Sequence, residues 1–149
     1  MFRLFLFLSL VSFIISLCLP VYAGEQGKLG ILAFLGGWTV FLNDVPTAIS
    51  WLANVLYVFA VICIFKKKKP KPIAATVLAI LALIFGCAIF VSGEILHGYS
   101  ETLRSLPLGT AIYPWMSSFV LMAIAGLLKR KKLLVPVQPT ANPVPAEEA

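Results

Sequence analysis

Residues 46–91 read PTAISWLANVLYVFAVICIF KKKKPKP IAATVLAILALIFGCAIFV, and this stretch decides the fold. Two apolar segments, 46–65 and 73–91, stand on either side of a break that contains five lysines and two prolines. Each segment has about the 20 residues that a helix needs to cross a hydrocarbon core of roughly 30 Å. A lysine at the bilayer centre costs roughly 2.5 to 3.5 kcal/mol, so both segments must end at the membrane surface. We therefore expect two antiparallel transmembrane helices joined on a basic side.

Two more apolar segments repeat this pattern at the two ends of the sequence. One covers residues 2–21, and the other covers residues 108–128 and is closed by the basic run at 129–132. Short connections between the segments favour helices that run antiparallel to their neighbours. The sequence therefore predicts an all-α integral membrane protein, an antiparallel four-helix bundle formed by residues 1–132.

A shorter apolar run at residues 29–42 lies in the first outer loop. Its 14 residues would form about 21 Å of helix, which is short for a span. We expect an interfacial or re-entrant helix there, with a break at Gly36-Gly37. Residues 133–149 contain four prolines and little to bury, which predicts a disordered, proline-rich cytoplasmic tail.

Two features of these segments allow more than one interpretation. The small residue Ala23 fits a signal-peptidase site, so residues 1–23 are either a retained first helix or a cleaved signal peptide. The long apolar stretch and the single basic residue Arg3 favour retention. Pro114 either kinks the last helix or restarts it after a lead-in at residues 108–113.

Composition and charge also indicate a membrane protein. The 149 residues are 60% hydrophobic and 12% charged, with a mean hydropathy of +0.99, which leaves too little polar surface to cover a soluble globule. The net charge of +6 comes mostly from basic residues in two runs beside apolar segments rather than from a basic face that would bind nucleic acid. We expect the lipid bilayer as the main partner and no nucleic acid.

The basic residues predict the orientation as well. Ten of them, Arg3 and those at 66–71 and 129–132, would lie on one side, against Lys28 and Arg104 on the other. This asymmetry predicts a multi-pass protein of a bacterial inner membrane with both termini in the cytoplasm. Aromatic residues near the predicted outer boundary agree with it: Tyr22, Trp38, Trp51, Tyr99, Tyr113 and Trp115.

Few residues suggest chemistry. Glu94, His97 and Glu101 would share one face if a helix continued past the third span, where they could hold a metal ion or relay a proton. Gly93 and Gly98 make an unbroken helix there doubtful, and a solvated outer loop is the favoured interpretation. We find no phosphate-binding loop, nucleophile elbow or zinc-ligand set, so we expect no cofactor and no enzymatic activity.

The remaining candidate residues serve contacts rather than reactions. Asn54 is the most polar residue of the second span and could line a polar seam, although an interhelical hydrogen bond is favoured. Serines of the first span and small residues of the last two spans suggest close helix packing: Ser9, Ser12, Ser16, Gly86, Ala88, Ala123 and Gly126. Anionic lipid headgroups would contact the basic runs, Lys66, Lys67, Lys68, Lys69, Lys71, Lys129, Arg130, Lys131 and Lys132.

Several of these stretches resemble a known group. They are SLCLP at 16–20, GGW at 36–38, WLAN at 51–54, and residues 109–128 with Tyr113, Trp115 and Ser118-Phe119. Together they are similar to small uncharacterised bacterial inner-membrane proteins with four spans, over most of residues 1–128. Val55 and Pro114 depart from the pattern. The resemblance implies the architecture and no activity.

Three functions remain for a chain of this kind. The favoured hypothesis is a non-enzymatic accessory or structural membrane factor that acts through helix contacts with a membrane-protein partner or with a second copy of itself. The second is a small channel or transporter subunit that works as an oligomer and uses Asn54. The third is an outer-surface metal-binding or enzymatic site at Glu94, His97 and Glu101.

Overall fold

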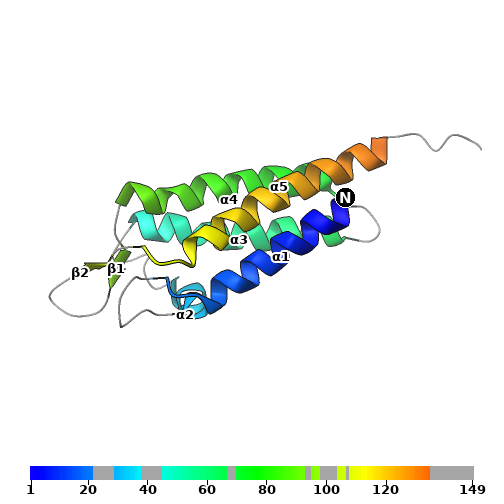
Figure 1. Cartoon of the computed structure of the whole chain (residues 1–149). Helices are drawn as coiled ribbons and strands as arrows, with labels where there is room; N and C mark the ends of the chain where they lie inside the picture. The colour runs from blue at the N-terminus through cyan, green and yellow to red at the C-terminus, as the bar shows by residue number, and fades with distance from the viewer. Residues whose placement is uncertain are drawn as a thin grey trace, which may run out of the picture.

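The protein is mainly helical, and its four long helices lie side by side (Figure 1). The computed structural model describes residues 1–21, 29–37, 45–66, 70–92, 95–97, 104–106 and 108–134. The long helices are α1 (Phe2–Cys18), α3 (Val45–Phe65), α4 (Pro72–Ser92) and α5 (Ile112–Leu134). A short helix, α2 (Gly30–Gly36), follows α1, and two three-residue strands, β1 (Ile95–His97) and β2 (Arg104–Leu106), pair antiparallel between α4 and α5.

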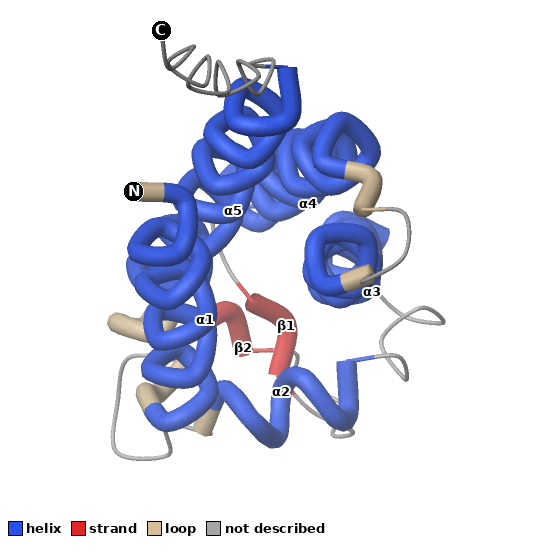
Figure 2. The backbone as a smooth tube through the Cα atoms, turned by 90° about the vertical axis from the view of Figure 1, so that its right-hand side faces the viewer, coloured by secondary structure: helices blue, strands red, loops and turns tan. Residues whose placement is uncertain are grey.

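The helices pack in an order that differs from their order in the chain. α1 packs against α5, α5 against α4, and α4 against α3, and the members of each pair are antiparallel (Figures 1 and 2). The starts of α1 and α4 and the ends of α3 and α5 therefore lie together, as shown by a bond from Lys129 Nζ in α5 to the Ile64 carbonyl in α3. We call this the basic end. α2 and the β1–β2 hairpin lie at the opposite end of the helices.

Three of the four long helices are long and apolar enough to cross a membrane, namely Thr47–Phe65, Pro72–Phe90 and Ile112–Leu134. The predicted all-α membrane class agrees with this finding. α1 is apolar but shorter, with 17 residues.

α1 ends three residues before the predicted boundary of the first span at residue 21. Pro20 disfavours a helical conformation at the residue before it, and Leu19 is extended with φ −92° and ψ 156°. The chain then forms an isolated antiparallel bridge between Pro20 and Leu29, and the Gly30 amide donates to the Leu19 carbonyl over 2.9 Å. The start of α2 therefore lies against the end of α1.

α5 also differs from its prediction at both ends. It begins at Ile112 rather than at residue 108, so Pro114 lies in the first helical turn, where its missing amide hydrogen would have no intrahelical acceptor. Pro114 therefore belongs to the start of the helix and is not a mid-helix kink. The helix continues past residue 128 through the basic run to Leu134, because lysine, arginine and leucine are good helix formers. The predicted tail boundary at 133 is thus too early, and residues 135–149 lie outside the described residues.

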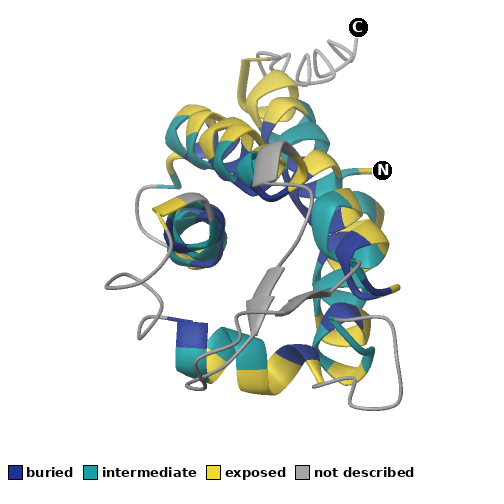
Figure 3. Cartoon of the chain, turned by 90° about the vertical axis from the view of Figure 1, so that its left-hand side faces the viewer, coloured by how far each residue is buried: buried dark blue, intermediate teal, exposed yellow. Residues whose placement is uncertain are grey.

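Small side chains dominate the packed interior. Fully buried alanines occur on three helices, and larger buried side chains fill the space between them. The buried core includes Ala53, Tyr57, Ala60, Ile64, Ala75, Ala79, Ala82, Phe119, Met122 and Ala125. Large apolar side chains are also exposed, among them Phe7 on α1, Phe59 on α3 and Ile84 on α4. Figure 3 shows that exposed positions occur along the outer sides of the helices. A helix that is apolar on all sides requires lipid or protein around it.

α2 closes one end of the helix arrangement between α1 and α3 (Figure 2). The Trp51 Nε1 of α3 donates to the Phe34 carbonyl over 2.8 Å, and the Phe34 ring meets Phe13 of α1 edge to face at 6.1 Å. α2 ends at Gly36, where the sequence predicted a break, and Gly37 sits against the Trp51 ring. Residues 38–42 of the predicted segment lie outside the described residues.

Candidate functional site

The polar side chains of α1 connect this helix to α5. Ser9 Oγ donates to the Ser118 carbonyl over 2.8 Å, and Ser12 Oγ donates to the Pro114 carbonyl over 2.7 Å. Ser16 bonds within α1, to the Phe13 carbonyl at 2.6 Å. Two of the three predicted packing serines therefore join helices.

Tyr57 extends this polar contact to α3. Its hydroxyl lies 2.9 Å from Ser9 Oγ, and Ser9 already gives its only hydroxyl hydrogen to the Ser118 carbonyl. Tyr57 must therefore donate to Ser9, which produces a chain from the Tyr57 hydroxyl through Ser9 to the backbone of α5. The three groups come from α3, α1 and α5, and both side chains are buried.

Aromatic rings surround this hydrogen-bonded chain. The Tyr57 ring stacks on Phe13 of α1 with centroids 4.6 Å apart and lies 5.5 Å from the Phe119 ring of α5. Trp115 meets Phe119 edge to face at 5.0 Å. These rings fill the space between α1 and α3, whose backbones stand further apart than those of the neighbouring pairs.

Asn54 makes the interhelical hydrogen bond favoured by the sequence. Trp115 Nε1 of α5 donates to Asn54 Oδ1 of α3 over 2.7 Å, and Asn54 is 8% exposed. The amide oxygen that a polar seam would present to a substrate is therefore occupied by another helix.

Glycines set the spacing of α4 and α5. A Cβ atom at Gly126 would collide with Thr76 Oγ1 and lie 3.1 Å from the Pro72 carbonyl oxygen, and a Cβ atom at Gly86 would lie 2.8 Å from Met116 Sδ. The absence of side chains at both positions lets the helices approach closely, as the small residues in the sequence predicted. Thr76 itself bonds to the Pro72 carbonyl at 3.0 Å.

Lys129 is the basic residue that the structure ties most firmly to other helices. Its Nζ donates to the Ile64 carbonyl over 2.5 Å, at the last turn of α3, and stands 5.3 Å from the centre of the Phe2 ring. One ammonium group thus joins α1, α3 and α5 at the basic end. Lys66, Lys71, Arg130, Lys131 and Lys132 are exposed there, whereas Lys67, Lys68 and Lys69 lie outside the described residues.

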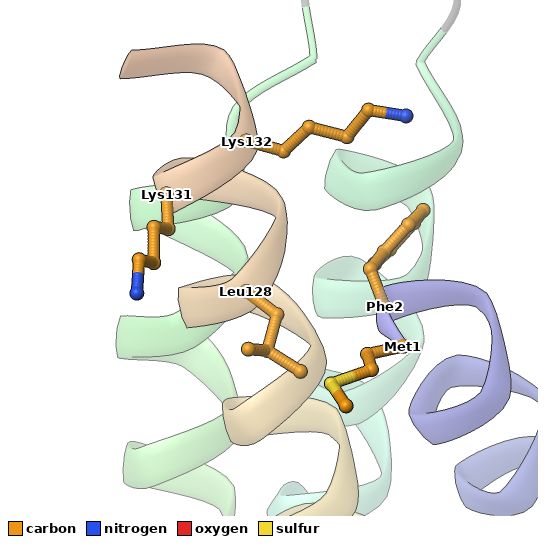
Figure 4. A pocket seen from close by; sticks show the side chains of 5 residues that line it. All are labelled: Met1, Phe2, Leu128, Lys131 and Lys132. Carbon is orange, nitrogen blue, oxygen red and sulfur yellow. The ribbon is translucent and has the colours of Figure 1, made fainter. Parts of the chain in front are cut away.

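An open hollow of about 260 Å³ lies beside this contact, between α1 and α5 (Figure 4). Met1, Phe2 and Leu128 form its apolar lining, and Lys131 and Lys132 supply its charge. Lys132 extends across the upper part of the hollow on the side of Phe2, and Lys131 lies along another side of α5.

The shared face of Glu94, His97 and Glu101 stays a prediction, because His97 is the one of the three that lies in the described part of the chain. α4 ends at Ser92, and Ile95–His97 forms β1, which pairs with β2. His97 is therefore in a strand and not in a helix that continues α4. Glu94 and Glu101 lie outside the described residues.

Four residues that join helices were not predicted in that role: Tyr57, Trp51 and Trp115 as hydrogen-bond donors, and Lys129 as a donor to α3. A signal was present for Tyr57, because a phenolic hydroxyl in the middle of an apolar span needs a partner within the protein. No comparable signal marked Lys129, which looked like its basic neighbours. Ser9, Ser12, Asn54, Tyr57, Trp115 and Lys129 all form hydrogen bonds that join one helix to another.

Comparisons with protein-family models, with curated proteins and with solved structures find no match for this chain.

Proposed function

We propose that this chain is a four-span inner-membrane protein that works without chemistry of its own, as an accessory or structural factor that contacts other membrane proteins through its helices. One observation carries the proposal. Several buried polar side chains join the helices inside the structure, as in the Tyr57–Ser9 and Trp115–Asn54 hydrogen bonds, while large apolar side chains face outward on all four long helices. Such a surface favours contact with lipid or with apolar helix faces.

The length and position of α1 support its role as the fourth span. Its 17 residues extend about 26 Å, at the low end of the range for a transmembrane helix. It runs beside α5, with Phe2 near Lys129 at one end and Ser12 bonded to the Pro114 carbonyl further along. A helix this short can be accommodated by local thinning of the bilayer.

The basic end supports an orientation with that end in the cytoplasm. Exposed basic residues from three parts of the chain lie at this end. They are Arg3 at the start of α1, Lys66 and Lys71 between α3 and α4, and Arg130, Lys131 and Lys132 at the end of α5. None of the four long helices contains an acidic residue. Short loops with an excess of lysine and arginine stay on the cytoplasmic side.

Cysteine labelling tests this orientation. In a variant in which the native cysteines, Cys18, Cys63 and Cys87, are replaced by alanine, a single cysteine is placed at Thr110 or at Lys71, which lie at opposite ends and are exposed. A membrane-impermeant maleimide added to intact cells with a permeable outer membrane should label Thr110→Cys and reach Lys71→Cys only after lysis. The reverse pattern would contradict the proposed orientation.

Photo-crosslinking from selected positions tests the partner. A photoreactive side chain at Phe59, which is 53% exposed on α3, should give an adduct with one defined membrane protein or with a second copy of the chain. The same group at Tyr57, which is 2% exposed on the same helix, is the inward control and should react within the chain. Mass spectrometry identifies the adducts. Equivalent reactivity at both positions, or only lipid adducts from Phe59 and from Ile84 of α4, would argue against a helix-contact function.

A further inference from the structure

We propose that the hollow between the start of α1 and the end of α5 binds the headgroup region of one anionic phospholipid. The inference rests on the membrane placement proposed above, but not on the orientation or on a protein partner. Met1, Phe2 and Leu128 line the hollow with apolar surface, Lys132 extends across it, and Lys131 lines it from another side of α5 (Figure 4). An apolar floor beneath cations matches a phosphate group followed by acyl chains.

The electrostatics of the basic end favour an anion in this hollow. The six acidic residues of the chain all lie outside the described residues, so no described carboxylate neutralises Lys131 or Lys132. Both lysines are exposed, and their flexible stems allow the two ammonium groups to turn toward one phosphate. Lys129 is bonded to the Ile64 carbonyl, and Lys131 and Lys132 are the basic side chains that line the hollow.

The size and surroundings of the hollow favour a lipid over a free ion. Its volume of about 260 Å³ suits a headgroup rather than a whole lipid, because it lies just below the roughly 300–1,000 Å³ of small-molecule pockets. The acyl chains would continue along α5, where Ile124 and Leu121 precede Leu128 by four and seven residues on the same helix face. Both are half-buried and apolar, so they extend the apolar floor toward the middle of the bilayer.

Native mass spectrometry of the full chain in mild detergent tests this site with phosphatidylglycerol and phosphatidylcholine as probes. The parent should retain one phosphatidylglycerol per chain in preference to phosphatidylcholine. Lys131→Gln/Lys132→Gln should weaken phosphatidylglycerol binding on the order of tenfold, since each lysine near a membrane surface contributes to anionic-lipid binding. The matched control, Lys66→Gln/Lys71→Gln, removes the same charge from exposed positions at the same end that do not line the hollow.

Each outcome decides the proposal. Equal weakening by the two double variants would mean diffuse attraction to the basic end, and a parent without lipid preference would mean that no site exists. Leu128→Glu places a carboxylate in the lining and should release the lipid even though both lysines remain. Inorganic phosphate at the same concentration should not displace phosphatidylglycerol, and displacement would assign the hollow to free phosphate instead. Because the experiment is done in detergent, its failure leaves the labelling and crosslinking results unaffected.

Discussion

The hydroxyl of Tyr57 lies 2.9 Å from Ser9 Oγ and connects α3 to α1, two helices whose backbones stand apart. Ser9 passes the hydrogen-bonded chain on to the Ser118 carbonyl of α5. The contact therefore holds together helices that would otherwise meet mainly through the rings of Phe13 and Tyr57. Removing the Tyr57 hydroxyl and removing the Ser9 hydroxyl should therefore destabilise the protein to different extents.

Tyr57→Phe should cost about 0.5–1.5 kcal/mol of unfolding free energy, because Ser9 keeps its bond to α5. Ser9→Ala should cost more, about 1–3 kcal/mol, because it leaves the buried Tyr57 hydroxyl without its acceptor. The double variant should be less destabilised than the sum of the single variants. Unfolding in mixed detergent micelles measures all three, and additivity within about 0.5 kcal/mol would show that the two residues are not coupled.

Asn54→Leu should destabilise the protein by about 0.5–2 kcal/mol without abolishing any flux, because the Asn54 oxygen accepts the Trp115 indole hydrogen. Trp115→Phe is the matched partner variant, and the double variant completes a cycle that isolates the hydrogen bond. The readouts are unfolding in detergent and ion or solute flux in liposomes. Flux in the parent that is lost in Asn54→Leu, with unfolding unchanged, would favour the channel or transporter hypothesis.

Gly126→Leu should separate α4 from α5, because Thr76 and the Pro72 carbonyl occupy the space of any side chain there. Overpacking typically costs about 1–3 kcal/mol of unfolding free energy, and this variant should lose more than that. Gly126→Ala should also destabilise, although alanine is the better helix former by about 1 kcal/mol. Gly36→Ala is the control, since a Cβ atom at Gly36 meets nothing within 4 Å. It should leave the detergent unfolding midpoint nearly unchanged, and equal loss at both glycines would contradict the role of close packing.

Lys129→Met should loosen the last turn of α3 and cost about 1 kcal/mol, because the ammonium group bonds to the Ile64 carbonyl near a helix C-terminus. Lys131→Met removes the same charge from an exposed neighbour and should change stability by less than about 0.5 kcal/mol. Amide hydrogen exchange at the end of α3, measured in detergent without anionic lipid, distinguishes the two. If amide protection at the end of α3 is the same in Lys129→Met as in the parent, the Lys129–Ile64 hydrogen bond does not stabilise that turn.

The sequence was sufficient for the positions of the long helices, because hydropathy and the basic breaks report directly on length and burial in lipid. Their ends were harder to predict. α1 ended earlier than predicted, because Pro20 restricts the backbone of Leu19. α5 ended later than predicted, because the basic residues at 129–132 continue the helix. Charge limits where a span leaves the bilayer, but it does not stop the helix itself.

The contacts between helices were largely hidden in the sequence. Since the spans are apolar on all sides, no periodic pattern distinguishes the face of Gly126 that meets Thr76 from the faces exposed to lipid. The packing order, with α5 between α1 and α4, is also absent from the sequence. Asn54 was predicted to join helices, but its partner Trp115 looked like an interfacial aromatic residue, and only the three-dimensional arrangement brings the two together.

The order of packing has a consequence for the timing of biosynthesis. Ser9 and the residue whose carbonyl it binds are 109 positions apart in the chain. At about 5–20 residues per second, a ribosome needs roughly 5–20 s to make that stretch. The hairpin of α3 and α4 is complete well before then, so Ser9 and Ser12 of the first helix lack their carbonyl acceptors on α5 until that helix is made. The last helix to emerge is the one that gives the first its neighbour.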